Sequence, residues 1–170
     1  MTKRFLQAFH DLIGYEGEYS NQQADRGGET RYGISKKSYP NRDIANLTLE
    51  DAKAIYYVDF WHALRLDEVE DDQVAYEIFD TAVNCGTTTA VRIAQKAMNF
   101  LGSRLEVDGI MGTRTISAIN TWTRHDPEIL HKALNGYQFI HYAKIIEADE
   151  SQIAFSRGWL KRIQYYRRKA

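Results

Sequence analysis

Two acidic residues and a threonine stand close together near the start of the chain. Glu16 is followed nine positions later by Asp25, and Thr30 comes five positions after that. A carboxylic acid on one side of a sugar linkage and a carboxylate that activates water on the other can cleave a glycosidic bond by general acid/base chemistry. A neighbouring hydroxyl could help to orient the water. These three residues are therefore a candidate catalytic set, with Glu16 as the acid.

The segment before Glu16 has the pattern of an amphipathic helix. Its apolar residues recur at helical intervals and are Phe5, Leu6, Phe9, Leu12 and Ile13. Glu16 continues this stripe, because it follows Ile13 by three positions and Leu12 by four. A carboxyl group desolvated on such a face keeps its proton to higher pH, as a general acid requires. The alternative is an exposed glutamate in a frayed last turn.

A glycine-rich turn follows and could present the second carboxylate. Asp25-Arg26-Gly27-Gly28 is a strong turn signal, because glycine accepts positive φ. Thr30 and Tyr32 then alternate with polar residues, which is typical of a short strand. Asp25 could instead cap its own backbone. Glu29, in the same turn, and Asp80, on a later helix, remain alternatives for the second carboxylate.

Aromatic rings and one amide are candidates for substrate contacts. The chain has 11 tyrosines and 3 tryptophans, and aromatic rings offer flat apolar faces on which sugars stack. We expect Tyr19, Tyr32 and Trp61 to stack on sugar rings of the substrate, and Asn84 is a further candidate for a substrate contact through its amide. The alternatives are core positions for the rings and a helix-end role for the amide. The five histidines lack metal-ligand spacing, so we expect no metal and no cofactor.

Several longer motifs occur in order along nearly the whole chain. They are Glu16-Gly17-Glu18-Tyr19, Asp25 to Ile34, Tyr56 to Trp61, Phe79 to Gly86, Val107 to Thr115 and Phe155 to Arg162. With them the chain resembles glycoside hydrolase family 108 with a C-terminal peptidoglycan-binding segment. That family comprises N-acetylmuramidases and includes phage endolysins and secretion-activator proteins. One departure is Glu18, which replaces the second glycine of the family's Glu-Gly-Gly-Tyr motif.

The resemblance implies a bacteriolytic lysozyme that cuts the β-1,4 bond between N-acetylmuramic acid and N-acetylglucosamine in peptidoglycan, with Glu16 as its catalytic acid. The order Glu16, Asp25, Thr30 is also similar to the arrangement in T4-type phage lysozymes, in which the last two residues position a water. The sequence leaves open whether the anomeric configuration is inverted or retained. A lytic transglycosylase and a non-enzymatic wall-binding or secretion-activating protein are the alternatives.

The remaining pattern predicts a mainly α protein of the α+β lysozyme-like superfamily. We expect a helical bundle in two lobes, with at most a small hairpin around residues 24–35 near the active site. Residues 1–86 would form the catalytic lobe and residues 87–170 a peptidoglycan-binding lobe, packed together as one compact unit. Helix starts are predicted at Thr48, Asp71, Thr87–Thr89, Thr113 and Asp126-Pro127, and a last helix carries Phe155, Trp159 and Ile163.

The amino-acid composition is typical of a folded protein and does not indicate a strongly charged binding partner. Hydrophobic residues make up 44% and charged residues 26%, and the formal net charge is −1, so nothing favours nucleic acid or an anionic membrane. Cys85 is the single cysteine, and no segment is apolar enough to span a membrane. The N-terminus does not have the pattern of a signal peptide. We expect a monomer made in the bacterial cytoplasm, which needs a holin, lysis or a secretion system to act in the periplasm or cell wall on glycan strands.

Overall fold

The computed structural model describes residues 1–13 and 29–167 and divides the chain into two compact units. Unit 1 comprises Met1–Ala63 and unit 2 comprises Leu64–Ala170. Helices dominate both units, and a single two-stranded sheet occurs among the described residues. The predicted mainly α, lysozyme-like fold class is confirmed. The division into functional lobes at residue 86 stays a prediction.

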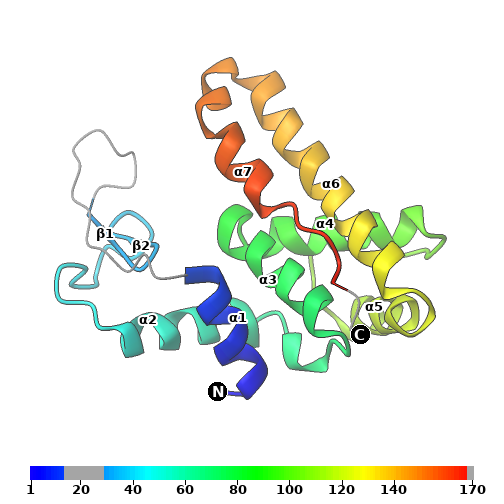
Figure 1. The fold of residues 1–170 in the computed structure, drawn as a ribbon, viewed down its shortest axis with the longest axis horizontal. Coiled ribbons are helices and arrows are strands. Elements are labelled where there is room, and N and C mark those ends of the chain that lie inside the picture. Colours follow the sequence, from blue (N-terminus) through cyan, green and yellow to red (C-terminus); the bar gives the residue numbers. More distant parts are fainter. Residues whose placement is uncertain (14–28, 168–170) are drawn as a thin grey trace. The chain divides into compact units, whose positions relative to one another are not determined.

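Unit 1 contains the helices α1 (Lys3–Ile13) and α2 (Leu49–Tyr56), which Figure 1 shows. Aromatic side chains form its centre. The ring of Phe5 lies 5.9 Å from that of Phe9 and 5.0 Å from that of Tyr57, and Phe9 lies 5.5 Å from Tyr56. Phe5 and Phe9 therefore form the inner stripe of α1, as their spacing predicts. Leu6 is wrongly predicted to share that stripe, since it is 42% exposed.

The start of α2 is fixed by a capping box, as the sequence predicts. The Thr48 hydroxyl accepts from the Asp51 backbone N–H at 3.1 Å, and the Asp51 carboxylate accepts from the Thr48 N–H at 3.1 Å. The helix then widens into the π-helical segment η1 (Tyr57–His62). The predicted helix toward Trp61 is thus present, but the change in its winding carries no clear sequence signal.

Unit 2 consists of helices packed around one another. They are η2 (Leu66–Glu68), α3 (Asp72–Cys85), α4 (Thr87–Phe100), α5 (Thr113–His125), α6 (Pro127–Ala148), η3 (Glu150–Phe155) and α7 (Ser156–Arg162). The helix α3 packs against both α4 and α6, and α6 also contacts α4 and α5. The buried residues of α6 lie on one broad face of the helix and include Leu130, Leu134 and Gln138.

Two of the predicted helix starts in unit 2 have the expected side-chain caps and two do not. Asp71 accepts from the backbone of α3 and Asp126 from that of α6, where Pro127 occupies the first turn. Thr87 and Thr113, in contrast, are already the first helical residues. Their N-caps are glycines without a side-chain bond, so the predicted threonine caps are wrong.

The loop between α4 and α5 is held by two amide side chains of α4. Gln95 donates to Asp108 Oδ1 at 2.7 Å and accepts from the Gly109 N–H at 2.9 Å, while Asn99 bonds both backbone groups of Leu105. Gly109 has φ +82, and a Cβ there would lie 2.7 Å from the Thr88 methyl group. The loop is therefore a fixed turn.

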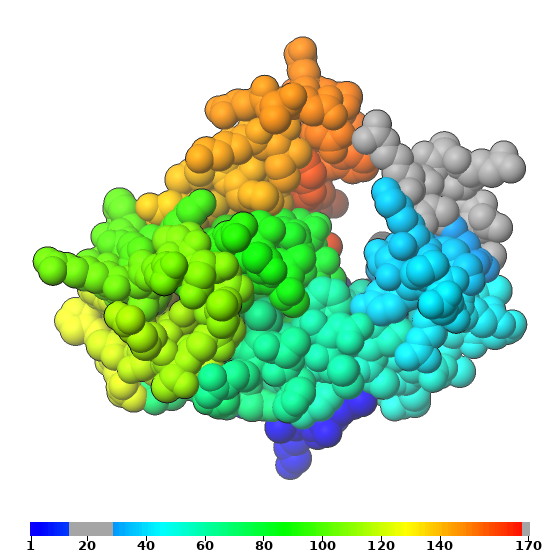
Figure 2. Space-filling model, turned by 180° about the vertical axis from the view of Figure 1, so that it is seen from behind, coloured from blue at the N-terminus to red at the C-terminus, as the bar shows by residue number. Residues whose placement is uncertain are grey.

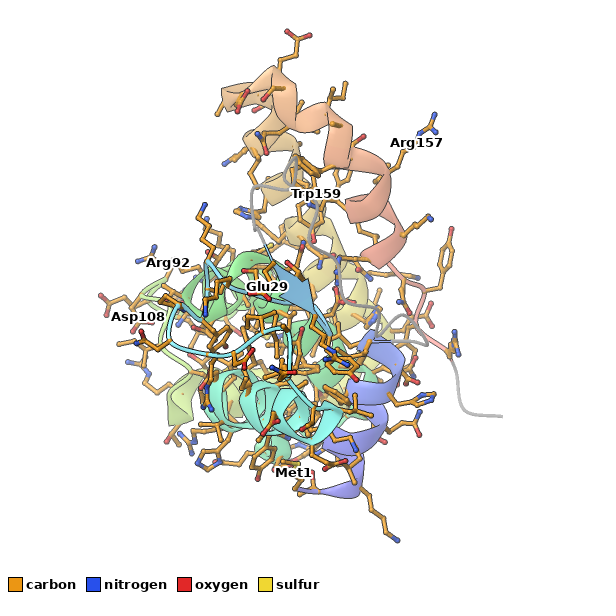
Figure 3. The ribbon with its side chains drawn as sticks, turned by 90° about the vertical axis from the view of Figure 1, so that its left-hand side faces the viewer. Met1, Glu29, Arg92, Asp108, Arg157 and Trp159 are labelled. Atoms are coloured by element: carbon orange, nitrogen blue, oxygen red, sulfur yellow. The ribbon has the colours of Figure 1, made fainter. Side chains whose placement is uncertain are left out.

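The last part of unit 2 stands out from its other helices. Figure 2 shows the end of α6, η3 and α7, in orange, projecting from the green helices α3 and α4. The ring of Trp159 on α7 (labelled in Figure 3) stacks on Tyr142 of α6, with 5.0 Å between ring centroids and 10° between planes. The predicted last helix is shorter than expected, because Phe155 belongs to η3 and Ile163 follows the end of α7.

Candidate functional site

A tight hairpin presents the part of the candidate catalytic motif that the structure describes. Strand β1 (Thr30–Arg31) pairs antiparallel with β2 (Ile34–Ser35), and Thr30 lies opposite Ser35. Tyr32 and Gly33 connect the strands with φ +51 and +75. Two successive positive φ values are typical of the turns that match the twist of a hairpin. A hairpin is therefore present within residues 24–35, as predicted. The prediction that Tyr32 continues the strand begun at Thr30 is wrong, because the chain turns at Tyr32 and Gly33.

The hairpin is anchored to α2 by one tyrosine. The Tyr56 hydroxyl donates to the Tyr32 carbonyl at 3.1 Å. A Cβ on Gly33 would lie only 2.6 Å from the same hydroxyl, so the turn requires glycine here for space as well as for its φ value. Tyr56 is itself 3% exposed, so its hydroxyl is held by the core of unit 1.

Four consecutive residues of the hairpin carry groups that could serve a polar ligand. Glu29 (labelled in Figure 3) and Thr30 are half-buried, and the Glu29 carbonyl accepts from the Lys36 N–H at 2.8 Å, which extends the pairing. The Arg31 guanidinium bonds the Ala45 carbonyl and lies 5.4 Å from the Tyr32 ring centroid. The Thr30 hydroxyl and the Tyr32 ring thus sit on a backbone fixed on both sides.

The structure tests only one of the other candidate site residues of unit 1. Glu16, Tyr19 and Asp25 lie outside the described residues. Trp61 is 1% exposed and its ring makes an edge contact with that of Phe5 at 5.7 Å. A tryptophan ring that is buried to this extent has no free face on which a sugar could stack. The expectation that Trp61 binds substrate is therefore wrong, and Trp61 is a core residue.

In unit 2, Asn84 and Asp80 are both engaged by neighbouring helices. Asn84 is half-buried near the end of α3 and donates to the Tyr142 hydroxyl at 2.7 Å. Asp80 is 4% exposed and its Oδ1 accepts from Arg162 at the end of α7. Burial raises the pKa of Asp80, and the guanidinium opposes this rise. An aspartate so placed is suited to hold α7 against α3 rather than to activate water.

A buried polar seam joins α3 to α6, and sequence reasoning missed it. Its members lie at helical intervals on the facing sides of the two helices, and all but the half-buried Asn84 are buried. They are Glu77, Asp80, Thr81, Asn84, His131, Asn135, Gln138 and Tyr142. Gln138 donates to Thr81 at 2.8 Å, and His131 Nε2 lies 3.5 Å from Glu77 Oε2. The sequence signal that could have indicated it is in α6, which is apolar on most faces yet carries polar residues three, four and seven positions apart.

Burial sets the protonation of the glutamate and histidine in this seam. Glu77 is 1% exposed, and its burial, followed by the charge of Asp80, raises the pKa of its carboxyl to about 8. Burial lowers the pKa of His131, and the Asp71 carboxylate opposes that change. Near neutral pH the carboxyl group therefore keeps its proton while the imidazole is neutral.

Within residues 1–13 and 29–167, no three histidine, cysteine, aspartate or glutamate side chains are placed to hold a metal ion. None of the helices described is both long and apolar enough to cross a membrane.

The helical fold with its small hairpin defines a lysozyme-like protein. Residues 9–86 match the family model described as glycosyl hydrolase 108, and residues 89–164 match that of a predicted peptidoglycan domain. The first half of the chain is therefore a glycoside hydrolase family 108 segment and the second half a peptidoglycan-binding segment, as the sequence motifs indicate. The family comprises glycosidases, and the second segment makes peptidoglycan of the cell wall the polymer that the protein binds or hydrolyses.

Structural comparison supports the same fold. The structure of SagA from Brucella abortus superposes with a TM-score of 0.76 at 23% sequence identity, covering 94% of this chain and 88% of that protein. At this identity the likeness concerns the fold alone. No curated protein sequence matches the chain significantly.

Proposed function

We propose that the protein is an N-acetylmuramidase, a lysozyme that hydrolyses the β-1,4 bond between N-acetylmuramic acid and N-acetylglucosamine. The observation that carries this proposal is that the glycosyl hydrolase 108 match spans Glu16, Asp25 and Thr30 in one segment. The peptidoglycan domain over residues 89–164 supports the choice of polymer. In this division of labour, residues 1–86 supply the chemistry and residues 87–170 bind the wall.

The proposed mechanism uses two carboxyl groups and no cofactor. Glu16 protonates the leaving glycosidic oxygen, and Asp25 activates or orients a water molecule on the opposite face of the sugar. Thr30 assists through its hydroxyl, for which a fixed hairpin is a suitable support. Tyr19 and Tyr32 offer rings to the sugars, and Asn84 a hydrogen bond to an N-acetyl group.

Clearing of purified peptidoglycan, followed by mass spectrometry of the released fragments, tests the proposal. The wild type should clear the suspension and release fragments with reducing muramic ends. Glu16→Gln and Asp25→Asn should each lose activity by a factor of about 100 or more, since each removes a proton-transfer group. Glu18→Gln is the matched control, because it removes a neighbouring carboxylate that has no proposed role and should retain activity.

Three outcomes would contradict the proposal in different ways. Anhydro-muramic ends, with Asp25→Asn still active, would identify a lytic transglycosylase, which needs one acid and no activated water. Binding to sacculi without clearing at high protein concentration would identify a wall-binding or secretion-activating protein. Equal loss in Glu18→Gln and Glu16→Gln would remove the assignment of Glu16 as the acid.

A further inference from the structure

The chain after α7 forms an extended segment that lies along α3 and α6 through polar contacts. We call residues 163–167 the C-terminal strap. The Gln164 carbonyl accepts from Asn135 at 2.7 Å, and the Tyr166 hydroxyl donates to Asp71 at 2.9 Å. Gln73 pairs with both backbone groups of Arg167, at 2.6 and 2.7 Å. Since most of the strap is exposed, these hydrogen bonds hold it in place more than apolar burial does.

Beneath the strap, a chain of hydrogen bonds fixes the form of His131. Asn135 uses its two amide hydrogens to reach the Gln164 carbonyl at 2.7 Å and His131 Nδ1 at 3.1 Å. Nδ1 must therefore carry a lone pair, so the hydrogen of the neutral ring is on Nε2, which faces Glu77 Oε2 at 3.5 Å. The docked strap thus depends on an unprotonated Nδ1.

A proton on Nδ1 would reverse this arrangement. The new N–H would point at the Asn135 NH₂ group, so two donors would face each other. Asn135 Oδ1 is buried and has no hydrogen-bond partner among the described residues. Rotation of the amide would turn this oxygen toward the imidazolium and satisfy both groups. The same rotation withdraws the NH₂ group from Gln164, and the strap loses its link to α6.

We propose that the C-terminal strap is an acid-released latch, with His131 as its sensor and the Asn135 amide as its two-position switch. The charged and titratable groups that face His131 are Glu77 and Asp71 of the α3 region and Tyr166 of the strap, whose ring lies 5.6 Å from the imidazole. At neutral pH the buried imidazole is uncharged and the latch is closed. As pH falls below 6.5, the ordinary pKa of histidine, one proton taken from solvent increasingly opens it.

Hydrogen exchange of the Arg167 backbone amide, followed by NMR on the full chain, measures latch opening. This amide donates to Gln73 Oε1 at 2.6 Å, so its protection reports docking of the strap. As pH falls below 6.5, the ordinary pKa of a histidine exposed in the released state, protection in the wild type should fall by up to about tenfold per pH unit, after correction for the intrinsic exchange rate. Unchanged protection from about pH 7.5 down to about pH 5 would overturn the proposal.

Two substitutions and one control separate the latch from general loosening. His131→Gln can still accept from Asn135 but cannot be protonated, so protection should be independent of pH. Asn135→Asp removes the donor to Gln164, so protection should be low throughout. His141→Gln, on the same helix and away from the strap, should behave as the wild type does. A fall with pH that persists in His131→Gln would refute the sensor.

A measurement on the wild type alone covers the case in which His131→Gln fails to fold. Nitrogen-15 chemical shifts of the histidine side chains distinguish the two neutral tautomers. The latch requires His131 to carry its hydrogen on Nε2 at neutral pH and to gain the Nδ1 hydrogen as the Arg167 amide loses protection. An Nδ1–H tautomer at neutral pH, or titration at a pH unrelated to the loss of protection, would sink the proposal.

Discussion

Replacing the buried Glu77 by glutamine should change how stability depends on pH. In the unfolded chain a glutamate loses its proton near pH 4.5, whereas burial raises the pKa of Glu77 in the folded protein to about 8. Between these values only the folded state holds the proton. The free energy of unfolding of the wild type therefore falls as pH rises through this window, by about 1.4 kcal/mol per pH unit.

The effect of Glu77 can be measured without a contribution from histidine in the part of this pH range above the ordinary pKa of histidine. The pKa of His131 is lowered from 6.5, so its contribution to stability declines only as pH falls below 6.5 and opposes that of Glu77 there. From pH 6.5 to about 8, Glu77 titrates without this opposition. Glu77→Gln should gain about 2 kcal/mol relative to the wild type over that interval.

Urea unfolding, followed by tryptophan fluorescence at several pH values, provides the measurement. Glu147→Gln is the control, because Glu147 is an exposed glutamate on the same helix as His131. Its free energy of unfolding should stay parallel to that of the wild type. If the Glu77→Gln curve is also parallel to the wild type, Glu77 is not a protonated buried acid, and the electrostatic account of the polar seam is wrong.

Three further substitutions test packing and caps. Gly109→Ala should cost about 2 kcal/mol, because it forces a side chain into φ +82 against α4, whereas Gly112→Ala meets nothing within 4 Å; thermal unfolding compares them. Thr48→Ala should cost about 1 kcal/mol in urea unfolding through loss of the capping box, and Thr48→Ser should restore most of it. Arg162→Met should cost about 3 kcal/mol by leaving Asp80 buried and unpaired, and adding Asp80→Asn should recover part of that loss.

Local chemistry made several elements predictable from the sequence. The reciprocal pairing of Thr48 with Asp51 and the cap of Asp126 before Pro127 depend on residues within three positions, and the structure contains both. Such features are readable because their partners are neighbours in the chain.

Long-range packing decided what the sequence could not show. Trp61 has the flat aromatic ring that a sugar-stacking residue needs. Its burial, however, depends on packing against Phe5, which is far away in the sequence. The pairing of Glu77 with His131 across α3 and α6 is likewise set by how the two helices meet. The proposed catalytic roles of Glu16 and Asp25 rest on motif and family rather than on geometry.

The packing of α3 has a consequence for how this protein could be divided or recombined. In sequence this helix closes the glycosyl hydrolase 108 match, but in space it packs against α4 and α6, within the unit that holds the peptidoglycan domain. A fragment begun at Thr87 would lack one wall of its own core and half of the polar seam. A peptidoglycan-binding segment exchanged between relatives would therefore have to include α3 in order to fold. The segment defined by sequence similarity begins at residue 89, whereas the compact unit that contains it begins at Leu64.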